Sequence, residues 1–443
     1  MKIKNLFVSI LLLFIYQPGK SQQWLDVGGG ADYQVYCFYH DTVSNLLYVG
    51  GHFDHLGANT IHQIGLWDGS NWAAVGANEQ FKKNSFSGTI MAITLYNGEL
   101  IAAGLFDSVA GIPANNIARW DGTQWNSMGN GFDERVYTLQ FYNGELYAGG
   151  EFNHSGNDTI YNISKWDGTN WVRLSQGWGL DNAVTSMTIF NQKLIIGGLF
   201  GGPFLSSIIG RVIAWDGTNW LSMNGAFNDF VSRLKNINDT LYAVGPFTSF
   251  SSNPSNYISR WGGTAWQPMP YPSGGSQPQI NDVVLYMGNL FVCGLFSQPP
   301  DIAKFNGSSY DSVGNAAGFV RTMIVYNDEL YVAGGFSAIN GIPLYNIARY
   351  NLGTGIEEIS KASQLLIYPN PISVTEKLHF QFNDFAYEHY LNLFDIGGRN
   401  IVPFLLHNNE SSLELPDKLK SGTYFITVTD KKNNKRSAKL ILN

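Results

Sequence analysis

Four residues with metal-ligand side chains lie close together early in the chain: His52, Asp54, His55 and His62. Imidazole and carboxylate groups suit zinc or copper. A loop of the same length also fits an arrangement in which all four side chains point apart into solvent, so a metal site stays open at this point. The EF-hand aspartate pattern is absent, although single carboxylates and carbonyl oxygens in a channel could hold calcium. We expect no cofactor other than such an ion.

A second set of residues combines aromatic rings with acids in the loops between predicted strands. Aromatic faces beside carboxylate and amide groups suit the recognition of a glycan or a peptide. The alternative is that the rings cover the ends of sheets and that the acids are solvated or cap turns. The candidate binding residues are Tyr33, Phe132, Asp133, Trp178, Asp181, Phe227, Asp229 and Tyr271.

The sequence contains none of the common catalytic motifs, such as His-Glu-x-x-His, Gly-x-Ser-x-Gly, a phosphate loop or a dinucleotide fingerprint. We therefore expect a non-catalytic binding or adhesion module for a glycan or protein. The alternative is a polysaccharide hydrolase or lyase that uses acids such as Asp133, Glu134 and Asp181. Two carboxyl groups about 5 to 9 Å apart in a concave pocket would indicate a glycosidase. A structural surface element without a specific ligand is a third interpretation.

A repeat of about 47 residues must position these loops. The motif Leu-x-x-x-Gly-x-Phe occurs seven times, first at residues 47–53 and last at residues 330–336. A second motif, Trp-Asp-Gly-x-x-Trp, follows it but is only half present after the last copy. Residues 24–28, Trp-Leu-Asp-Val-Gly, match the missing half. The repeat is thus circularly permuted, which predicts a seven-bladed β-propeller over residues 22–355 that is closed by its N-terminal strand.

Each repeat is predicted to form four short strands. In the third copy these are residues 136–142, 146–152, 163–166 and a strand from 171, with Asn143-Gly144 as the first hairpin turn. The motif glycine predicts a bulge or a close approach of a neighbouring blade, and the tryptophans are predicted to wedge between blades. One face of such a ring carries the long, dissimilar loops, which makes that face the candidate binding surface.

Composition supports an all-β, folded protein. Glycine accounts for 49 of 443 residues and charged residues for 14%, a turn-rich and weakly charged composition. Residues 22–355 hold 14 Lys and Arg against 24 Asp and Glu, a net charge of −10, so we expect no nucleic-acid partner. The two cysteines, Cys37 and Cys293, are predicted to be buried free thiols. We expect a monomer.

The N-terminus reads as a secretory signal peptide of residues 1–21. Lys2 and Lys4 precede an apolar run at residues 6–16, and Gly19 and Ser21 suit a cleavage site. No run reaches the ~20 apolar residues that span a bilayer, so no transmembrane helix is expected.

The C-terminus reads as a separate domain. Residues 356–363 form a polar linker, and residues 364–443 predict a small β-sandwich. Its landmark residues are Tyr368, Pro369, Asn370, Pro371, Gly398, Gly422 and Tyr424.

At these residues the chain resembles the type A C-terminal sorting domain of the type IX secretion system of Bacteroidetes. The resemblance implies that the type IX machinery is a partner, that the domain is cleaved after export, and that the protein is secreted or attached to the outer cell surface. The repeats of residues 24–355 resemble kelch-type propellers through the Gly-Gly that ends the second strand and the aromatic pair of the second motif. This second resemblance implies a fold rather than an activity.

Overall fold

The computed structural model contains two compact units: Trp24–Asn351, and a second unit that includes the C-terminal residues 352–443. The described residues are 23–174, 179–203, 210–274, 278–298, 300–351, 366–373, 376–381, 389–395, 400–406, 412–416, 419–430 and 435–443. The predicted signal peptide, the linker, Trp178 and Gly398 lie outside them. Every described element is a β-strand, which confirms the all-β prediction; the predicted domain boundaries stay predictions.

Six four-stranded antiparallel sheets repeat one order along Trp24–Asn351, in which each strand pairs with the next main strand of the chain. The first three are β2 (Val35–Asp41), β3 (Leu46–Gly51), β6 (Ile64–Trp67), β7 (Trp72–Ala74); β10 (Thr89–Tyr96), β11 (Glu99–Leu105), β14 (Ile117–Trp120), β15 (Trp125–Ser127); and β16 (Val136–Tyr142), β17 (Glu145–Gly150), β20 (Ile163–Trp166), β21 (Trp171–Val172). The next three are β22 (Val184–Phe190), β23 (Lys193–Gly198), β24 (Val212–Trp215), β25 (Trp220–Ser222); β26 (Arg233–Ile237), β27 (Thr240–Val244), β30 (Ile258–Trp261), β31 (Trp266–Pro268); and β32 (Gln279–Tyr286), β33 (Asn289–Ser297), β34 (Pro300–Phe305), β35 (Tyr310–Gly314).

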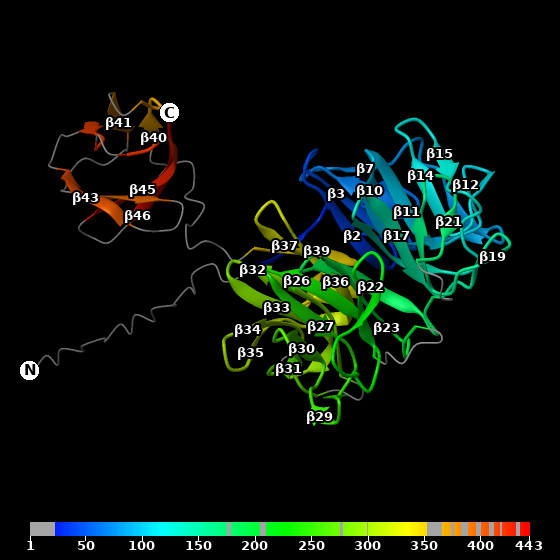
Figure 1. Ribbon diagram of the computed structural model, residues 1–443. Helices are drawn as coiled ribbons and strands as arrows, with labels where there is room; N and C mark the ends of the chain where they lie inside the picture. Colours follow the sequence, from blue (N-terminus) through cyan, green and yellow to red (C-terminus); the bar gives the residue numbers. More distant parts are fainter. Residues whose placement is uncertain are drawn as a thin grey trace, which may run out of the picture. The chain divides into compact units, whose positions relative to one another are not determined.

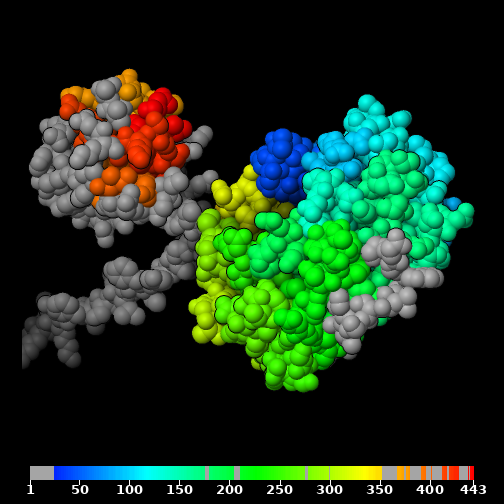
Figure 2. Space-filling view, in the orientation of Figure 1, coloured from blue at the N-terminus to red at the C-terminus, as the bar shows by residue number. Residues whose placement is uncertain are grey.

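A further sheet joins the two ends of this unit. Its order is β36 (Ala316–Tyr326), β37 (Glu329–Ile339), β39 (Ile347–Asn351) and β1 (Gln23–Asp26), with β38 (Ile342–Pro343) beside β37. The N-terminal strand therefore pairs with the last sheet, as the permuted repeat predicts. The blue and yellow segments lie side by side in Figures 1 and 2 for this reason.

The first strands of successive sheets are neighbours. The strand β2 lies beside β10, and the series continues through β16, β22, β26, β32 and β36. The strand β36 in turn lies beside β2.

Tryptophan side chains connect adjacent sheets through the fourth strands. The indole Nε1 of Trp72 donates to the carbonyl oxygen of Val27 at 2.8 Å, and Trp171 Nε1 donates to Met128 at 3.2 Å. Trp24 Nε1 donates to the carbonyl oxygen of Val313, at the end of β35, at 3.0 Å. These buried rings fill the space between sheets, as predicted, and their polar N–H groups are satisfied there.

The motif glycine faces a β-bulge of the first strand in its own sheet. A Cβ on Gly150 would overlap the carbonyl oxygen of Arg135, and one on Gly104 would overlap that of Thr89. The first of the two predicted explanations is therefore correct, and the close neighbour is the same sheet rather than the next one. Cys37 and Cys293 are buried and unpaired, as predicted.

The C-terminal unit has two antiparallel sheets. One pairs β40 (Leu366–Tyr368), β41 (Lys377–Gln381) and β44 (Ser412–Glu414), and the other has the order β43 (Asn400–Leu406), β42 (His389–Asp395), β45 (Gly422–Asp430) and β46 (Lys435–Leu442). Leu378 of the first sheet and Leu391, Ile426 and Leu440 of the second belong to one buried cluster. The two sheets thus share a core.

The remaining short strands decorate the connections of the first unit. They are β4 (His55–Leu56), β5 (Asn59–Thr60), β8 (Phe81–Lys83), β9 (Phe86–Ser87), β12 (Ser108–Val109), β13 (Ile112–Pro113), β18 (His154–Ser155), β19 (Asp158–Thr159), β28 (Ser249–Phe250) and β29 (Asn253–Pro254).

Candidate functional site

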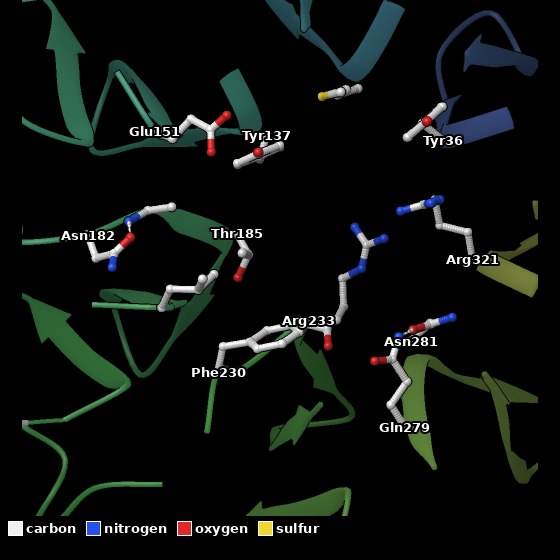
Figure 3. A pocket seen from close by; sticks show the side chains of 14 residues that line it. Tyr36, Tyr137, Glu151, Asn182, Thr185, Phe230, Arg233, Gln279, Asn281 and Arg321 are labelled. Atoms are coloured by element: carbon white, nitrogen blue, oxygen red, sulfur yellow. Dashed lines mark hydrogen bonds between the residues drawn. The ribbon is translucent and has the colours of Figure 1, made fainter. Parts of the chain in front are cut away.

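A cavity of about 360 Å³ lies where the first strands of the sheets meet (Figure 3). Its volume is within the usual range for small-ligand pockets. Every sheet of Trp24–Asn351 contributes at least one half-buried residue at the start of its first strand. These residues are Tyr36, Met91, Tyr137, Thr185, Ser232, Asn281 and Arg321.

The bulges of the first strands place these side chains in the cavity. The register of the first hairpin shifts between Val35 and Cys37, so Tyr36 is the extra residue of that bulge. Register shifts of the same kind make Tyr137 and Arg321 the extra, unpaired residues of the bulges in their sheets. The corresponding residues of three further sheets are Met91, Thr185 and Asn281. A bulge re-aims the side chain of its extra residue. Six of the seven main sheets therefore present their bulge residue to the cavity, whereas Ser232 lies directly before β26, whose pairing with β27 has no bulge.

Arg233 enters the same cavity from β26, beside a buried acid. Its Nε atom lies 3.9 Å from Oδ1 of Asp282, and Lys235 Nζ lies 3.6 Å from that oxygen. Asp282 has no exposed surface and accepts hydrogen bonds from the Val283 N–H, the Thr322 hydroxyl and the Met323 N–H at 2.9 to 3.0 Å. Burial acts to raise the pKa of Asp282, but Lys235 and Arg233 outweigh it and lower the pKa. Asp282 is thus a buried carboxylate.

Arg321 is held by aromatic rings instead of a carboxylate. Its guanidinium carbon lies 4.4 Å from the ring centre of Tyr36 and 5.3 Å from that of Phe319, which is a favourable cation–π geometry. Among the described residues Arg321 forms no ion pair. Burial lowers its pKa, and the nearby Arg233 lowers it further; an arginine remains charged nonetheless.

Neutral polar groups complete the lining. Gln279 Nε2 donates to Oδ1 of Asn281 at 2.6 Å, and Asn281 Nδ2 donates to the carbonyl oxygen of Val320 at 2.7 Å. Glu151 accepts a hydrogen bond from Arg135 Nη1 at 2.8 Å. The cavity thus offers amides, hydroxyls and aromatic faces around two guanidinium groups.

The predicted binding residues that the structure describes, which exclude Trp178, do not line this cavity. Phe132 and Phe227 are only 1% and 3% exposed, because they pack against Trp171 and Trp266 of the sheet cores. Their rings thus lie mostly inside the sheet cores, although Phe132 and Asp133 also border a separate surface hollow. Tyr33 and Tyr271 are 54% and 40% exposed, and Tyr33 borders a separate shallow hollow. Asp229 is exposed and accepts a hydrogen bond from the adjacent Phe230 N–H.

The predicted acids cap turns. Asp133 Oδ1 accepts hydrogen bonds from the backbone N–H groups of Asn153 and His154 at 2.8 and 2.9 Å, and Oδ2 lies 2.9 Å from Nδ1 of His154. Asp181 binds the N–H of Gly201 at 2.7 Å in the same way. Burial acts to raise the pKa of Asp133, but the hydrogen bonds from His154 and Asn153 outweigh it and lower the pKa. Glu134 is exposed.

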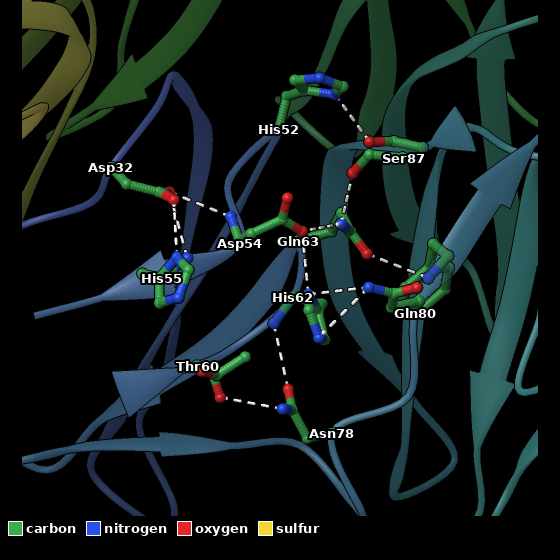
Figure 4. Close-up of polar contacts among 12 residues, drawn as sticks. Asp32, His52, Asp54, His55, Thr60, His62, Gln63, Asn78, Gln80 and Ser87 are labelled. Carbon is green, nitrogen blue, oxygen red and sulfur yellow. Dashed lines mark hydrogen bonds and ion pairs between the residues drawn. The ribbon is translucent and has the colours of Figure 1, made fainter. Parts of the chain in front are cut away.

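The predicted metal ligands form three separate contacts (Figure 4). His52 Nδ1 lies 2.8 Å from the carbonyl oxygen of Gly88, His55 Nδ1 lies 2.9 Å from Asp32, and His62 Nδ1 lies 2.9 Å from Asp54. Within the part of the chain that the structure describes, no three His, Cys, Asp or Glu residues converge on a metal position. His52, Asp54, His55 and His62 are therefore not brought together as one set of ligands.

The landmark residues of the C-terminal unit have structural contacts. Asn370 Oδ1 accepts a hydrogen bond from the Ile441 N–H, and the Tyr424 hydroxyl donates to the Lys420 carbonyl, both at 2.8 Å. Tyr368 stacks on His379, with ring centres 5.4 Å apart. Pro369 and Pro371 flank Asn370 in the turn after β40, and Gly422 begins β45.

Residues 366–443 match the protein family described as a secretion system C-terminal sorting domain. This type IX sorting domain indicates export to the cell surface or the extracellular space. No curated protein matches the chain. A solved structure of PorZ, described as an essential bacterial surface component of the type IX secretion system of Porphyromonas gingivalis, is similar at 12% identity and a TM-score of 0.36. The match covers 93% of this chain and 66% of the PorZ chain. No helix among the described residues is long and apolar enough to cross a membrane.

Proposed function

We propose that this exported protein is a surface binding module whose ligand site is the cavity at the first strands. The proposal includes the kelch-like, closed seven-bladed propeller and the signal peptide predicted from the sequence. The observation that carries it is the convergence of side chains from all seven main sheets on a single cavity, six of these sheets contributing a bulge residue. The ligand is a glycan or a protein segment outside the cell.

Two contacts support closure of the ring. The strand β36 lies beside β2, and the strand β1 completes the last sheet. Trp24 and Trp72 each hydrogen-bond to the fourth strand of the preceding sheet, so this connection continues across the ends of the unit. A closed ring leaves no open edges and gives the rigid frame that a binding site needs.

The acids favour binding over hydrolysis. Asp133 and Asp181 bind backbone N–H groups of another loop, Asp133 that of Asn153 and Asp181 that of Gly201, which leaves them poorly placed to exchange a proton with a substrate. Of the described residues that line the cavity, Glu151 alone carries a carboxyl group, and it is paired with Arg135. A glycosidase of the usual kind needs two facing carboxyl groups.

The test is to fill the cavity and measure binding by the full chain. Met91 lines the cavity and Met91→Trp adds an indole ring there. We expect it to weaken the binding of any ligand found on an array of glycans and surface proteins by at least about tenfold. The control is Val43→Trp, because Val43 is 94% exposed and remote from the cavity. Unchanged binding by Met91→Trp would contradict the proposal.

A further inference from the structure

The charges around the cavity are not balanced by the described residues. Arg233 and Lys235 share the single carboxylate of Asp282, and Arg321 has no carboxylate partner. This excess of positive charge lies inside a body, residues 22–355, whose net charge is −10. A half-buried cation without a partner is costly to the folded protein. An anionic ligand would balance it.

The same residues hold donors that lack acceptors. The Nε atoms of Arg233 and Arg321 and the hydroxyl of Ser232 are buried, and none has a hydrogen-bond partner among the described residues. All three residues line the cavity. Figure 3 shows the two guanidinium groups extending into the space between the labelled side chains. Buried donors in native proteins are nearly always satisfied, so a ligand that supplies oxygen acceptors fits this cavity.

The contacts of the Arg321 guanidinium group favour the binding of an oxyanion. Its contacts with the rings of Tyr36 and Phe319 restrict the movement of the guanidinium group. The N–H groups at the edge of that planar group can then bind two oxygens of one carboxylate or sulfate.

The remaining lining suits a sugar. Gln279, Asn281 and Thr185 carry groups that can hydrogen-bond hydroxyls, and the rings of Tyr36 and Phe230 provide apolar faces for the C–H groups of a pyranose.

We propose that this cavity binds the carboxylate or sulfate group of an acidic saccharide, with Arg321 and Arg233 as the anion-binding residues. This inference rests on the proposed function, because it names the ligand class of the same site.

The experiment measures binding of four probes to the full chain by calorimetry. Tetragalacturonate carries carboxylates, and its methyl ester is the neutral control; dextran sulfate carries sulfates, and dextran is the neutral control. At least one acidic probe should bind more tightly than its neutral counterpart, and the pair that shows this difference identifies the oxyanion. Arg321→Gln should weaken the binding of that acidic probe by at least about 30-fold. Arg119→Gln removes the same charge at an exposed ion pair with Glu99 and should leave binding unchanged.

A second readout separates a ligand role from a structural one. Arg321→Gln removes a buried charge and its repulsion by Arg233, so the melting temperature of the unliganded protein should stay the same or rise. Equal binding of acidic and neutral probes, full binding by Arg321→Gln, or a lower melting temperature of Arg321→Gln would overturn the inference. If Met91→Trp abolishes binding of a neutral glycan while no acidic probe binds, this inference fails and the proposed function stands. If Met91→Trp has no effect on any ligand, both fail.

Discussion

The turn acids and the two cavity arginines are sets of charged residues with opposite relations to the rest of the molecule. Asp133 and Asp181 have their oxygens bound by backbone N–H groups. Arg233 and Arg321 have buried N–H groups without acceptors. The acids thus accept hydrogen bonds from the backbone, whereas the Nε–H groups of the arginines have no acceptor among the described residues. The backbone of the fold therefore holds the acids, whereas the two arginines extend into a cavity.

The largest expected effect concerns the closed ring that we propose as the frame of both sets. Trp24 is 2% exposed and bonds to Val313, so Trp24→Ala should lower the free energy of unfolding by about 3–5 kcal/mol. Deletion of residues 22–30 removes β1 altogether and should leave open sheet edges that aggregate. Urea unfolding and light scattering measure these effects. A deletion variant with unchanged stability would contradict the closed ring and, with it, a shared frame for the two sets.

A smaller effect tests the structural role of the turn acids. Asp133→Ala should lower the free energy of unfolding by about 1–2 kcal/mol, because two backbone N–H groups lose their acceptor. Binding to the cavity should not change. The control is the adjacent Glu134→Ala, which removes an exposed acid and should alter neither quantity. Loss of binding in Asp133→Ala with normal stability would reverse the assignment of the two sets.

The smallest effect is a dependence on pH. The folded state lowers the pKa of Asp133 below its ordinary value of 3.8, so the ionised form stabilises the protein above that pH, and this contribution is lost as the pH falls through the lower, folded pKa. Asp133→Asn keeps an oxygen acceptor but cannot ionise. Its deficit in melting temperature relative to the wild type should be present at pH 6 and shrink as the pH falls below 3.8. A deficit that is constant with pH would indicate that ionisation of Asp133 is irrelevant.

The sheets and their permutation could be predicted because they depend on residues that recur. Strands β16, β20 and β21 begin where the repeat predicts, and Trp24 marks the strand that joins the last sheet. Repeated tryptophans and glycines occupy equivalent positions between and within the sheets, so their spacing in the sequence predicts the repeated sheets.

The candidate site could not be predicted in the same way. The bulge positions hold unlike residues, among them Tyr36, Met91 and Arg321; tyrosine alone occurs there twice, at Tyr36 and Tyr137, so no common residue type marks them. The available signal was weaker: an aliphatic residue such as Val35 or Val320 directly precedes each bulge. The burial of Phe132 and Phe227 could not be predicted, because an aromatic residue in a loop can pack against a tryptophan that is distant in the sequence.

The bulges also bear on how such a protein can change over time. Side chains at these positions project away from the packed interior of each sheet, so exchanging one of them leaves the tryptophan and glycine framework untouched. Under the proposed function, selection can therefore alter the ligand one substitution at a time, while the same scaffold is inherited intact.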